Sequence, residues 1–313
     1  MESFGYPLYL KCEAFNFAGS VKLKAAQSMV EAAEHSGKLT HGSTIVESTS
    51  GNLGLALSVI AAAKGYGFVC VVDARTNLTT RQMIEALGGV IHLISEPDAE
   101  GGFLGARLNH VRSLCAANPS YVWLNQHGNE NNWLAHYRTT GPAIDAQFPD
   151  LQTLFIGAGT TGTLMGCARY FKDKGHPVSV VAIDSIGSVT FGGEPGTRMI
   201  PGLGTGIRPD VLDESYVDDV EMVAEADAVL ICRRLARKGF MFGGSTGTVI
   251  AGALQWLDRR GASEAATTVA ISPDLGERYL DTVYQDRWVT DIYGERILSS
   301  KGWCDAVPGA PVA

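Results

Sequence analysis

Residues 153–163 read TLFIGAGTTGT, and this stretch decides the fold class. Its first four residues form a short β-rich run, a glycine-rich turn follows, and a helix-period segment begins at Thr161. A strand, a turn and a helix in this order make up half of a βαβ unit, the building block of parallel sheets. The same alternation continues along the chain in both directions, so we predict an α/β protein with mostly parallel sheets and helices on both faces.

The periodicity predicts the individual elements. Strands are expected at residues 7–12, 44–47, 67–72, 90–94, 121–124, 153–156, 178–183 and 268–271. Helices are expected at residues 20–36, 51–64, 79–87, 102–117, 133–147, 161–174, 225–238, 247–260 and 275–284. Residues 187–213 are rich in glycine and proline and follow neither period, which favours a functional loop. The tail 301–313 is expected to fray.

Composition narrows the class of function. The chain has 313 residues, enough for about two average domains. Its net charge of −8 disfavours nucleic acids and anionic membranes as partners. The six cysteines never form C-x-x-C, so neither a metal site nor a disulfide framework is predicted. We find no signal peptide or membrane span in the sequence, and we expect a cytoplasmic protein that acts on small molecules.

The segment Asn16-Phe-Ala-Gly-Ser-Val-Lys22 places a lysine in the first turn of a predicted helix. Amphipathic helices often carry such a lysine pointing at water, and Lys24 competes for any role given to Lys22. The functional interpretation is a Schiff-base lysine, whose amine is made nucleophilic by burial and by neighbouring positive charge. This segment alone leaves both interpretations open.

Three more stretches, each just before or at the start of a predicted helix, are candidate functional sites. Residues 47–54, ESTSGNLG, offer three consecutive hydroxyls at a helix start, more than an ordinary N-cap needs, and so favour a carboxylate or phosphate cradle. Residues 157–163 present N–H groups and hydroxyls to an anion. They also satisfy the dinucleotide pattern G-x-G-x-x-G, with Asp184 as the ribose-binding acid of a nicotinamide-dependent dehydrogenase. The glycines of residues 242–247 are explained by the needs of a tight turn. Ser245 is a candidate site residue only because the other motifs are also present.

Taken together and in this order, the four stretches resemble the fold-type II pyridoxal-phosphate enzymes of the cysteine synthase and cystathionine β-synthase family. Cysteine synthases typically read N-P-x-x-S-x-K, T-S-G-N, Q before an N-rich turn, G-T-G-G-T, G-G-S and G-E-R-Y-L. The matching stretches here are residues 16–22, 49–52, 126–129, 159–163, 243–245 and 276–280, within a resemblance that spans 8–285. Residues 47–54, 96–102, 125–126, 132–133, 160–162, 187–192 and 273–281 further resemble the N-(2-amino-2-carboxyethyl)-L-glutamate synthase branch of staphyloferrin B and related 2,3-diaminopropionate pathways.

The resemblance implies a tryptophan synthase β-like fold of two open, mostly parallel twisted sheets. A smaller mobile domain would span residues 16–126, and a larger one would combine 1–15 with 127–300. The implied cofactor, pyridoxal 5'-phosphate, would be bound by Lys22, Asn52, Gly159, Thr160, Thr161, Gly162, Thr163 and Ser245. Lys22 would hold it covalently and then take the α-proton of the substrate. A neutral Ser245 at the pyridine nitrogen would favour β-elimination over transamination.

The resemblance also implies the substrates. The substrate carboxylate would lie on Ser48, Thr49, Ser50 and Asn52, with Gln126 closing over it. Phosphate would leave from O-phospho-L-serine and the amine of L-glutamate would replace it. The main alternative is a cysteine synthase that uses O-acetylserine or O-phosphoserine with sulfide.

The loop 187–213 adds three candidate substrate contacts, Arg198, Arg208 and Ser188. A guanidinium group is a fixed fork that suits a phosphate or carboxylate, so either arginine could hold the donor phosphate or the glutamate carboxylates. Two features depart from the family pattern. Phe17 replaces the usual proline, and the lead segment that commonly packs across the subunit boundary is missing before the first strand. A homodimer is nevertheless expected.

Overall fold

The computed structural model describes residues 8–49, 51–97, 103–261 and 266–299. Its strands form two sheets in which every pairing is parallel. The larger sheet has the order β1 (Leu8–Cys12), β9 (Thr267–Ser272), β6 (Leu151–Gly157), β7 (Ser179–Ser185), β8 (Asp219–Val223). The smaller sheet has the order β4 (Val90–Ile94), β3 (Gly67–Asp73), β2 (Thr44–Ser48), β5 (Tyr121–Trp123).

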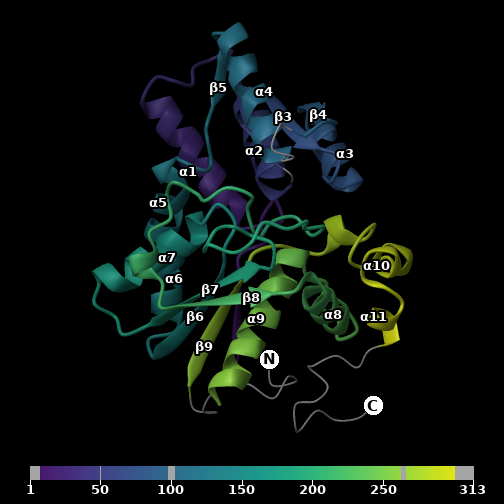
Figure 1. Ribbon diagram of the computed structural model, residues 1–313. Helices are drawn as coiled ribbons and strands as arrows, with labels where there is room; N and C mark the ends of the chain where they lie inside the picture. The colour runs from purple at the N-terminus through teal and green to yellow at the C-terminus, as the bar shows by residue number, and fades with distance from the viewer. Residues whose placement is uncertain (1–7, 50, 98–102, 262–265, 300–313) are drawn as a thin grey trace.

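Helices surround each sheet (Figure 1). Near the smaller sheet lie α1 (Lys22–His35), α2 (Asn52–Lys64), α3 (Leu78–Ala86) and α4 (Phe103–Ala117). Near the larger sheet lie α5 (Glu130–Arg138), α6 (Thr140–Gln147), α7 (Gly162–Asp173), α8 (Glu225–Ala236) and α9 (Gly244–Arg260). The 3₁₀ turns Glu214–Tyr216 and Glu277–Tyr279 and the helices α10 (Asp286–Tyr293) and α11 (Arg296–Ser299) complete the described elements.

Strand β6 shows why the central strands are apolar without interruption. Phe155 faces one side and packs in a buried cluster with Val249 of α9. Its neighbours Leu154 and Ile156 face the other side and pack in a second cluster with Leu164 of α7. Because successive side chains of a strand point to opposite faces, a strand covered on both faces needs apolar residues at every position.

The chain crosses between the sheets at their carboxyl ends. After β1 it leaves the larger sheet, forms α1 and builds the smaller sheet before it returns through α5 (Figure 1). The N–H of Val21 donates to the carbonyl of Pro273 at 2.8 Å, which joins the start of α1 to the end of β9. In open parallel sheets this edge is where ligands bind.

The predicted α/β class with two open parallel sheets is confirmed. The structure differs from the element predictions in three regions. Strand β8 was not predicted, because its sequence DVEMV mixes acidic and apolar residues at a sheet edge. The helix expected at 133–147 begins earlier and is interrupted at Thr139, where φ is −130°. The helix expected at 275–284 is a 3₁₀ turn, and α10 and α11, which were not expected, follow it.

The division into a mobile domain at 16–126 and a larger domain stays a prediction, although the strands of the smaller sheet all lie within 44–123. The expected fraying of 301–313 falls outside the described residues. Within the part of the chain that the structure describes, no helix has both the length and the apolarity to cross a membrane.

Candidate active site

Lys22 is the first residue of α1, and the turn before it fixes its position. The Asn16 side chain donates to the carbonyl of Ser20 at 2.9 Å and closes this turn. Gly19 adopts a φ of +58°, and its carbonyl accepts a hydrogen bond of 2.7 Å from Arg278. The turn therefore sets the lysine at the carboxyl end of β9, where the two sheets meet.

Desolvation lowers the pKa of Lys22 to about 8, although the nearby Asp274 carboxylate raises it in part. An amine with this pKa is unprotonated more often at neutral pH than an ordinary lysine and is a better nucleophile. Lys24 lies elsewhere. Its ammonium pairs with Glu13 at 2.6 Å and donates to Thr140 at 3.1 Å. Among the described residues that line the cleft, Lys22 is present and Lys24 is not.

The loop between β2 and α2 is held by a buried carboxylate. Oε1 of Glu47 accepts from the N–H of Ser48 at 3.0 Å and from Nε1 of Trp123 at 3.1 Å, and Oε2 accepts from the N–H of Gln126 at 3.3 Å. Burial raises the pKa of Glu47 to about 7. The Gln126 side chain donates to the Ser48 carbonyl at 2.8 Å, so one carboxylate joins the two segments predicted to bind the substrate carboxylate.

The loop between β6 and α7 approaches its neighbours too closely for side chains at its glycines. A Cβ atom on Gly159 would lie 2.6 Å from the carbonyl oxygen of Gly202, and one on Gly162 would lie 2.0 Å from Oδ1 of Asn132. Thr161 takes a left-handed φ of +61° at the start of α7. Its hydroxyl is buried and has no hydrogen-bond partner in the described part of the chain. A helix start with such groups suits an anion.

Ser245 lies in the first turn of α9 and is 2% exposed. Within the described residues its hydroxyl has no hydrogen-bond partner of standard geometry. Gly202 approaches so closely that a Cβ atom there would lie 2.2 Å from this hydroxyl. A buried hydroxyl without a partner is costly, and a ligand with a hydrogen-bonding atom would satisfy it.

These groups line one cleft of about 750 Å³ and the narrow pocket at its base. Lys22 and Asn52 line both, and the pocket continues past Thr161 and Thr163 to Ser245. An amine, an anion cradle and an unsatisfied hydroxyl in one pocket are the donor set that the aldehyde, phosphate and ring nitrogen of pyridoxal phosphate need. The residues present therefore fit the expected cofactor.

The structure brings most of the predicted site residues together. Those that line the cleft or its pocket are Lys22, Ser48, Thr49, Asn52, Gln126, Gly159, Thr160, Thr161, Gly162, Thr163, Arg198 and Ser245. Ser50 lies outside the described residues. Their roles toward cofactor and substrate stay predictions.

Two predicted contacts do not reach the cleft lining. Ser188 is fully buried, and its hydroxyl accepts from the N–H groups of Thr190 and Thr205 inside the loop. Arg208 lies at the surface, where it pairs with Glu214 at 2.6 Å. Ser188 and Arg208 therefore lie apart from the described residues that line the cleft.

The dehydrogenase alternative meets a geometric objection at Asp184. This residue is fully buried, and Oδ1 accepts from the N–H of Ser185 at 2.8 Å. Burial raises the pKa of Asp184, and Asp184 does not appear among the described residues that line the cleft. Asp184 is therefore not placed to bind a ribose in the cleft. The match of residues 157–162 to G-x-G-x-x-G does not by itself indicate a dinucleotide site.

The sequence analysis did not identify a cationic side chain, Arg107, that lines the cleft from the side of the smaller sheet. Arg107 lines the cleft from α4, and its side chain is only 9% exposed. Nε lies 3.5 Å from Oδ2 of Asp73, yet Nε and Nη1 have no hydrogen-bond partner among the described residues. Arg107 shares the buried stripe of α4 with Val111, four residues further on, and a charge on a buried stripe was the signal available in the sequence.

Two neighbours of Arg107 were also missed. Arg75 pairs with Asp73 at 3.1 Å and lines the same cleft. His127 is 9% exposed, and its Nδ1 is buried without a partner in the described residues. Desolvation, helped by the charges of Arg107 and Lys22, lowers the pKa of His127 to about 4, so the ring is neutral at physiological pH.

Comparisons with known proteins agree with this site. A family profile described as "Pyridoxal-phosphate dependent enzyme" matches residues 2–274. The chain is 38% identical to N-(2-amino-2-carboxyethyl)-L-glutamate synthase of Ralstonia nicotianae over 291 residues, which cover 92% of this chain and 86% of that protein. It also resembles a crystal structure of O-ureido-L-serine synthase, with a TM-score of 0.82 and 36% identity over 96% of this chain and 90% of that one.

The O-acetylserine-dependent cystathionine β-synthase of Helicobacter pylori has a TM-score of 0.81 and 29% identity, covering 91% of this chain and 93% of that one. The family profile spans most of the chain, and the identity to the Ralstonia protein extends over nearly all of it. This chain is a pyridoxal-phosphate-dependent β-replacement synthase of the cysteine synthase and cystathionine β-synthase family, with fold type II.

Proposed function

We propose that the enzyme replaces the phosphate of O-phospho-L-serine by the amine of L-glutamate and so makes N-(2-amino-2-carboxyethyl)-L-glutamate. The bond between the β-carbon and the phosphate oxygen breaks, and its electron pair leaves with phosphate. A bond between the β-carbon and the glutamate nitrogen forms, and the amine loses one proton. One phosphate is released for each product. The similarity to the Ralstonia synthase supports this choice.

Bound pyridoxal phosphate would supply the electron sink that makes the substrate α-proton acidic. Lys22 would hold the cofactor and move that proton, because its lowered pKa suits a group that both accepts and returns a proton near neutral pH. Ser48, Thr49 and Asn52 would bind the substrate carboxylate, with Gln126 held over it. Ser245 would present a neutral hydroxyl to the pyridine nitrogen.

The buried guanidinium of Arg107 is the observation that carries the choice of anionic substrates. Arg107 lines the cleft, and its buried Nε and Nη1 have no hydrogen-bond acceptor among the described residues, so its guanidinium has donor capacity that an anionic ligand in the cleft would use. A phosphate monoester carries about −1.5 to −2 charges at neutral pH, and glutamate brings two carboxylates. Neither an acetyl group nor sulfide needs such a partner.

Arg198 lines the same cleft from the loop that follows β7 of the larger sheet. Its guanidinium donates to the carbonyl of Gly187, and its side chain lines the cleft. Desolvation lowers the pKa of Arg198, whereas the carboxylates of Asp184 and Glu225 raise it. The positive charge of Arg75 also lowers this pKa, so Arg75 and Arg198 are close enough to interact electrostatically. Arg107 and Arg198 would then each bind anionic groups of the donor or of glutamate.

The test compares two arginines of the same helix. Arg107→Gln should lower kcat/KM for O-phosphoserine at least tenfold, the loss expected for one charge-assisted hydrogen bond, while cofactor absorbance is retained. Arg112→Gln is the matched control, because Arg112 is exposed on α4, and it should act as the wild type. If Arg107→Gln leaves both the donor and glutamate parameters unchanged, the anions bind elsewhere.

We also propose that the enzyme is a homodimer and that its product is cleaved by another enzyme to 2,3-diaminopropionate, for a siderophore or a related natural product. The family resemblance supports both statements. Size-exclusion chromatography with light scattering tests the first. The second requires an enzyme that oxidises the glutamate α-carbon of the product with a two-electron acceptor of the nicotinamide class, so that water cleaves the resulting imine into 2,3-diaminopropionate and 2-oxoglutarate. Incubation of the product with a lysate of the source cells and a nicotinamide cofactor, followed by mass spectrometry for these two compounds, tests it.

A further inference from the structure

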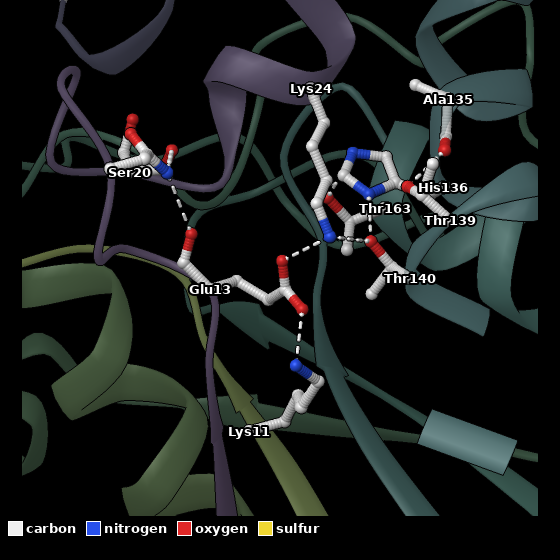
Figure 2. A network of polar contacts seen from close by, with 10 residues as sticks. Lys11, Glu13, Ser20, Lys24, Ala135, His136, Thr139, Thr140 and Thr163 are labelled. Atoms are coloured by element: carbon white, nitrogen blue, oxygen red, sulfur yellow. Dashed lines mark hydrogen bonds and ion pairs between the residues drawn. The ribbon is translucent and has the colours of Figure 1, made fainter. Parts of the chain in front are cut away.

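A chain of polar side chains runs from the predicted phosphate loop into the buried interior (Figure 2). Oγ1 of Thr163 lies 3.2 Å from Nε2 of His136, and Nδ1 of His136 lies 3.0 Å from Oγ1 of Thr140. The ammonium of Lys24 donates to the same Thr140 oxygen at 3.1 Å. Lys24 in turn pairs at 2.6 Å with Glu13, a carboxylate that is nearly inaccessible to solvent.

Lys24 sets the direction of the hydrogen bonds in this chain. An ammonium group can only donate, so the Thr140 oxygen accepts from it. Nδ1 of His136 lies in reach to accept the Thr140 hydrogen, and in the arrangement that gives this hydrogen an acceptor Nδ1 carries no hydrogen. Nε2 must carry the ring hydrogen and donate it to Thr163. The hydroxyl hydrogen of Thr163 remains available for an anion in the pocket that Thr163 lines.

The opposite direction of the hydrogen bonds would leave the predicted phosphate loop without the Thr163 donor. If Nδ1 of His136 carried the hydrogen, the Thr140 oxygen would face two donors and its own hydrogen would lose this acceptor. Thr163 would donate to Nε2 and would turn only its lone pairs toward a bound phosphate. The two arrangements contain the same heavy atoms, and they differ in whether Thr163 attracts or repels an anion.

The surroundings keep the histidine neutral, as this chain requires. His136 is fully buried, and desolvation together with the charges of Lys22 and Lys24 lowers its pKa to about 3. A neutral imidazole has one hydrogen, so the partner on one nitrogen determines the role of the other. Glu13 holds Lys24 beside Thr140, and Lys11 shares Glu13 at 3.0 Å without entering the chain.

We propose that Lys24 is a positioning residue, which acts through Thr140 and His136 to make Thr163 an obligatory hydrogen-bond donor to the cofactor phosphate. The proposal rests on the proposed role of Thr163 in the phosphate loop, and it is independent of which amino acids the enzyme takes as substrates. It gives Lys24 a purpose other than the Schiff-base role for which it competed in the sequence.

Cofactor affinity provides a test that needs no turnover. Pyridoxal phosphate is returned to the resolved full-length enzyme, and its dissociation constant is measured by fluorescence for the wild type, Thr163→Val, Lys24→Met and the double variant. Each single variant should bind about tenfold more weakly, and the double variant no more weakly than the weaker single variant, because both remove the same interaction. Lys24→Arg should keep most of the affinity.

Two controls isolate the phosphate. Pyridoxal, which lacks the phosphate, should bind all variants equally. Lys11→Met, which removes an ion pair to the same Glu13 carboxylate, should stay within about twofold of the wild type. Losses that multiply in the double variant, or wild-type affinity in a folded Lys24→Met, would overturn the proposal. An unchanged affinity in Thr163→Val would show instead that the phosphate-loop role itself is wrong.

A direct reading of the histidine keeps the proposal testable if Lys24→Met does not fold. Nitrogen NMR of the wild-type holoenzyme with labelled histidine should show His136 as the neutral tautomer with hydrogen on Nε2. The Nδ1 tautomer, or a protonated ring, at this position would contradict the inferred direction of the chain.

Discussion

Glu47 provides a sharp test of how the substrate-binding segments are held. Its carboxylate is fully buried and accepts hydrogen bonds from Ser48, Trp123 and Gln126. Burial raises its pKa from 4.5 to about 7 in the folded protein. Because the folded state holds this proton more tightly than the unfolded chain, the contribution of Glu47 to stability is fully present below pH 4.5 and is lost as the pH rises through 7.

The size of the effect follows from the two pKa values. A difference of about 2.5 at about 1.4 kcal/mol for each step corresponds to about 3 kcal/mol of unfolding free energy, lost between pH 4.5 and 7.5. In Glu47→Gln the side chain keeps its shape and no longer titrates. Its amide oxygen can still accept from Ser48 and Trp123, whereas its NH₂ group faces the N–H of Gln126, which removes that bond.

Urea unfolding at several pH values would measure the effect. The free energy of the wild type minus that of Glu47→Gln should fall by about 3 kcal/mol between pH 4.5 and pH 8, and other groups cancel in this difference. The KM for the amino-acid donor should rise in the variant, since Gln126 is less firmly held. A difference that is constant with pH, or that rises with pH, would refute the reasoning about the buried carboxylate.

Three further predictions concern the cofactor and the donor. Borohydride reduction should fix the cofactor to Lys22, and Lys22→Ala should lack the covalent adduct; mapping by mass spectrometry to Lys24 would contradict this. Gly162→Ala, whose Cβ would lie 2.0 Å from Oδ1 of Asn132, should weaken cofactor binding at least tenfold and destabilise the protein by about 1–3 kcal/mol, measured by titration and urea unfolding. Arg198→Ala should lower kcat/KM for O-phosphoserine and spare any reaction with O-acetylserine; equal losses with both donors would show that Arg198 does not recognise phosphate.

The sequence allowed the cofactor side of the site to be predicted, because that chemistry depends on local backbone. Glycines that bring the backbone close to its neighbours, as at Gly159 and Gly162, and hydroxyls at a helix start leave a signature within a few residues. Lys22 and Lys24 could not be separated in this way. Which of them faces the cleft is decided by Glu13 and Thr140, and Thr140 lies 116 residues from Lys24 along the chain.

The substrate side depends on tertiary contacts that local patterns do not contain. Arg198 and Arg208 look alike within the loop, yet Arg208 pairs with Glu214 six residues on, whereas Arg198 donates to the backbone at Gly187 and lines the cleft. Arg107 reaches the same cleft from α4, far away in the sequence. The only local sign of Arg107 was its position on the buried stripe of α4. The loop 187–213, from which substrate contacts were expected, supplies Arg198 to a different part of the cleft lining.

The identity of the product tests the central claim most directly. The holoenzyme is given O-phospho-L-serine, nitrogen-15 L-glutamate and an equal concentration of sulfide, and phosphate and products are quantified by colorimetry and mass spectrometry. We expect one phosphate for each molecule of N-(2-amino-2-carboxyethyl)-L-glutamate, with the label retained in the new C–N bond and little cysteine. Cysteine as the main product, or no phosphate release while O-acetylserine is consumed in a parallel reaction, would contradict the proposed function.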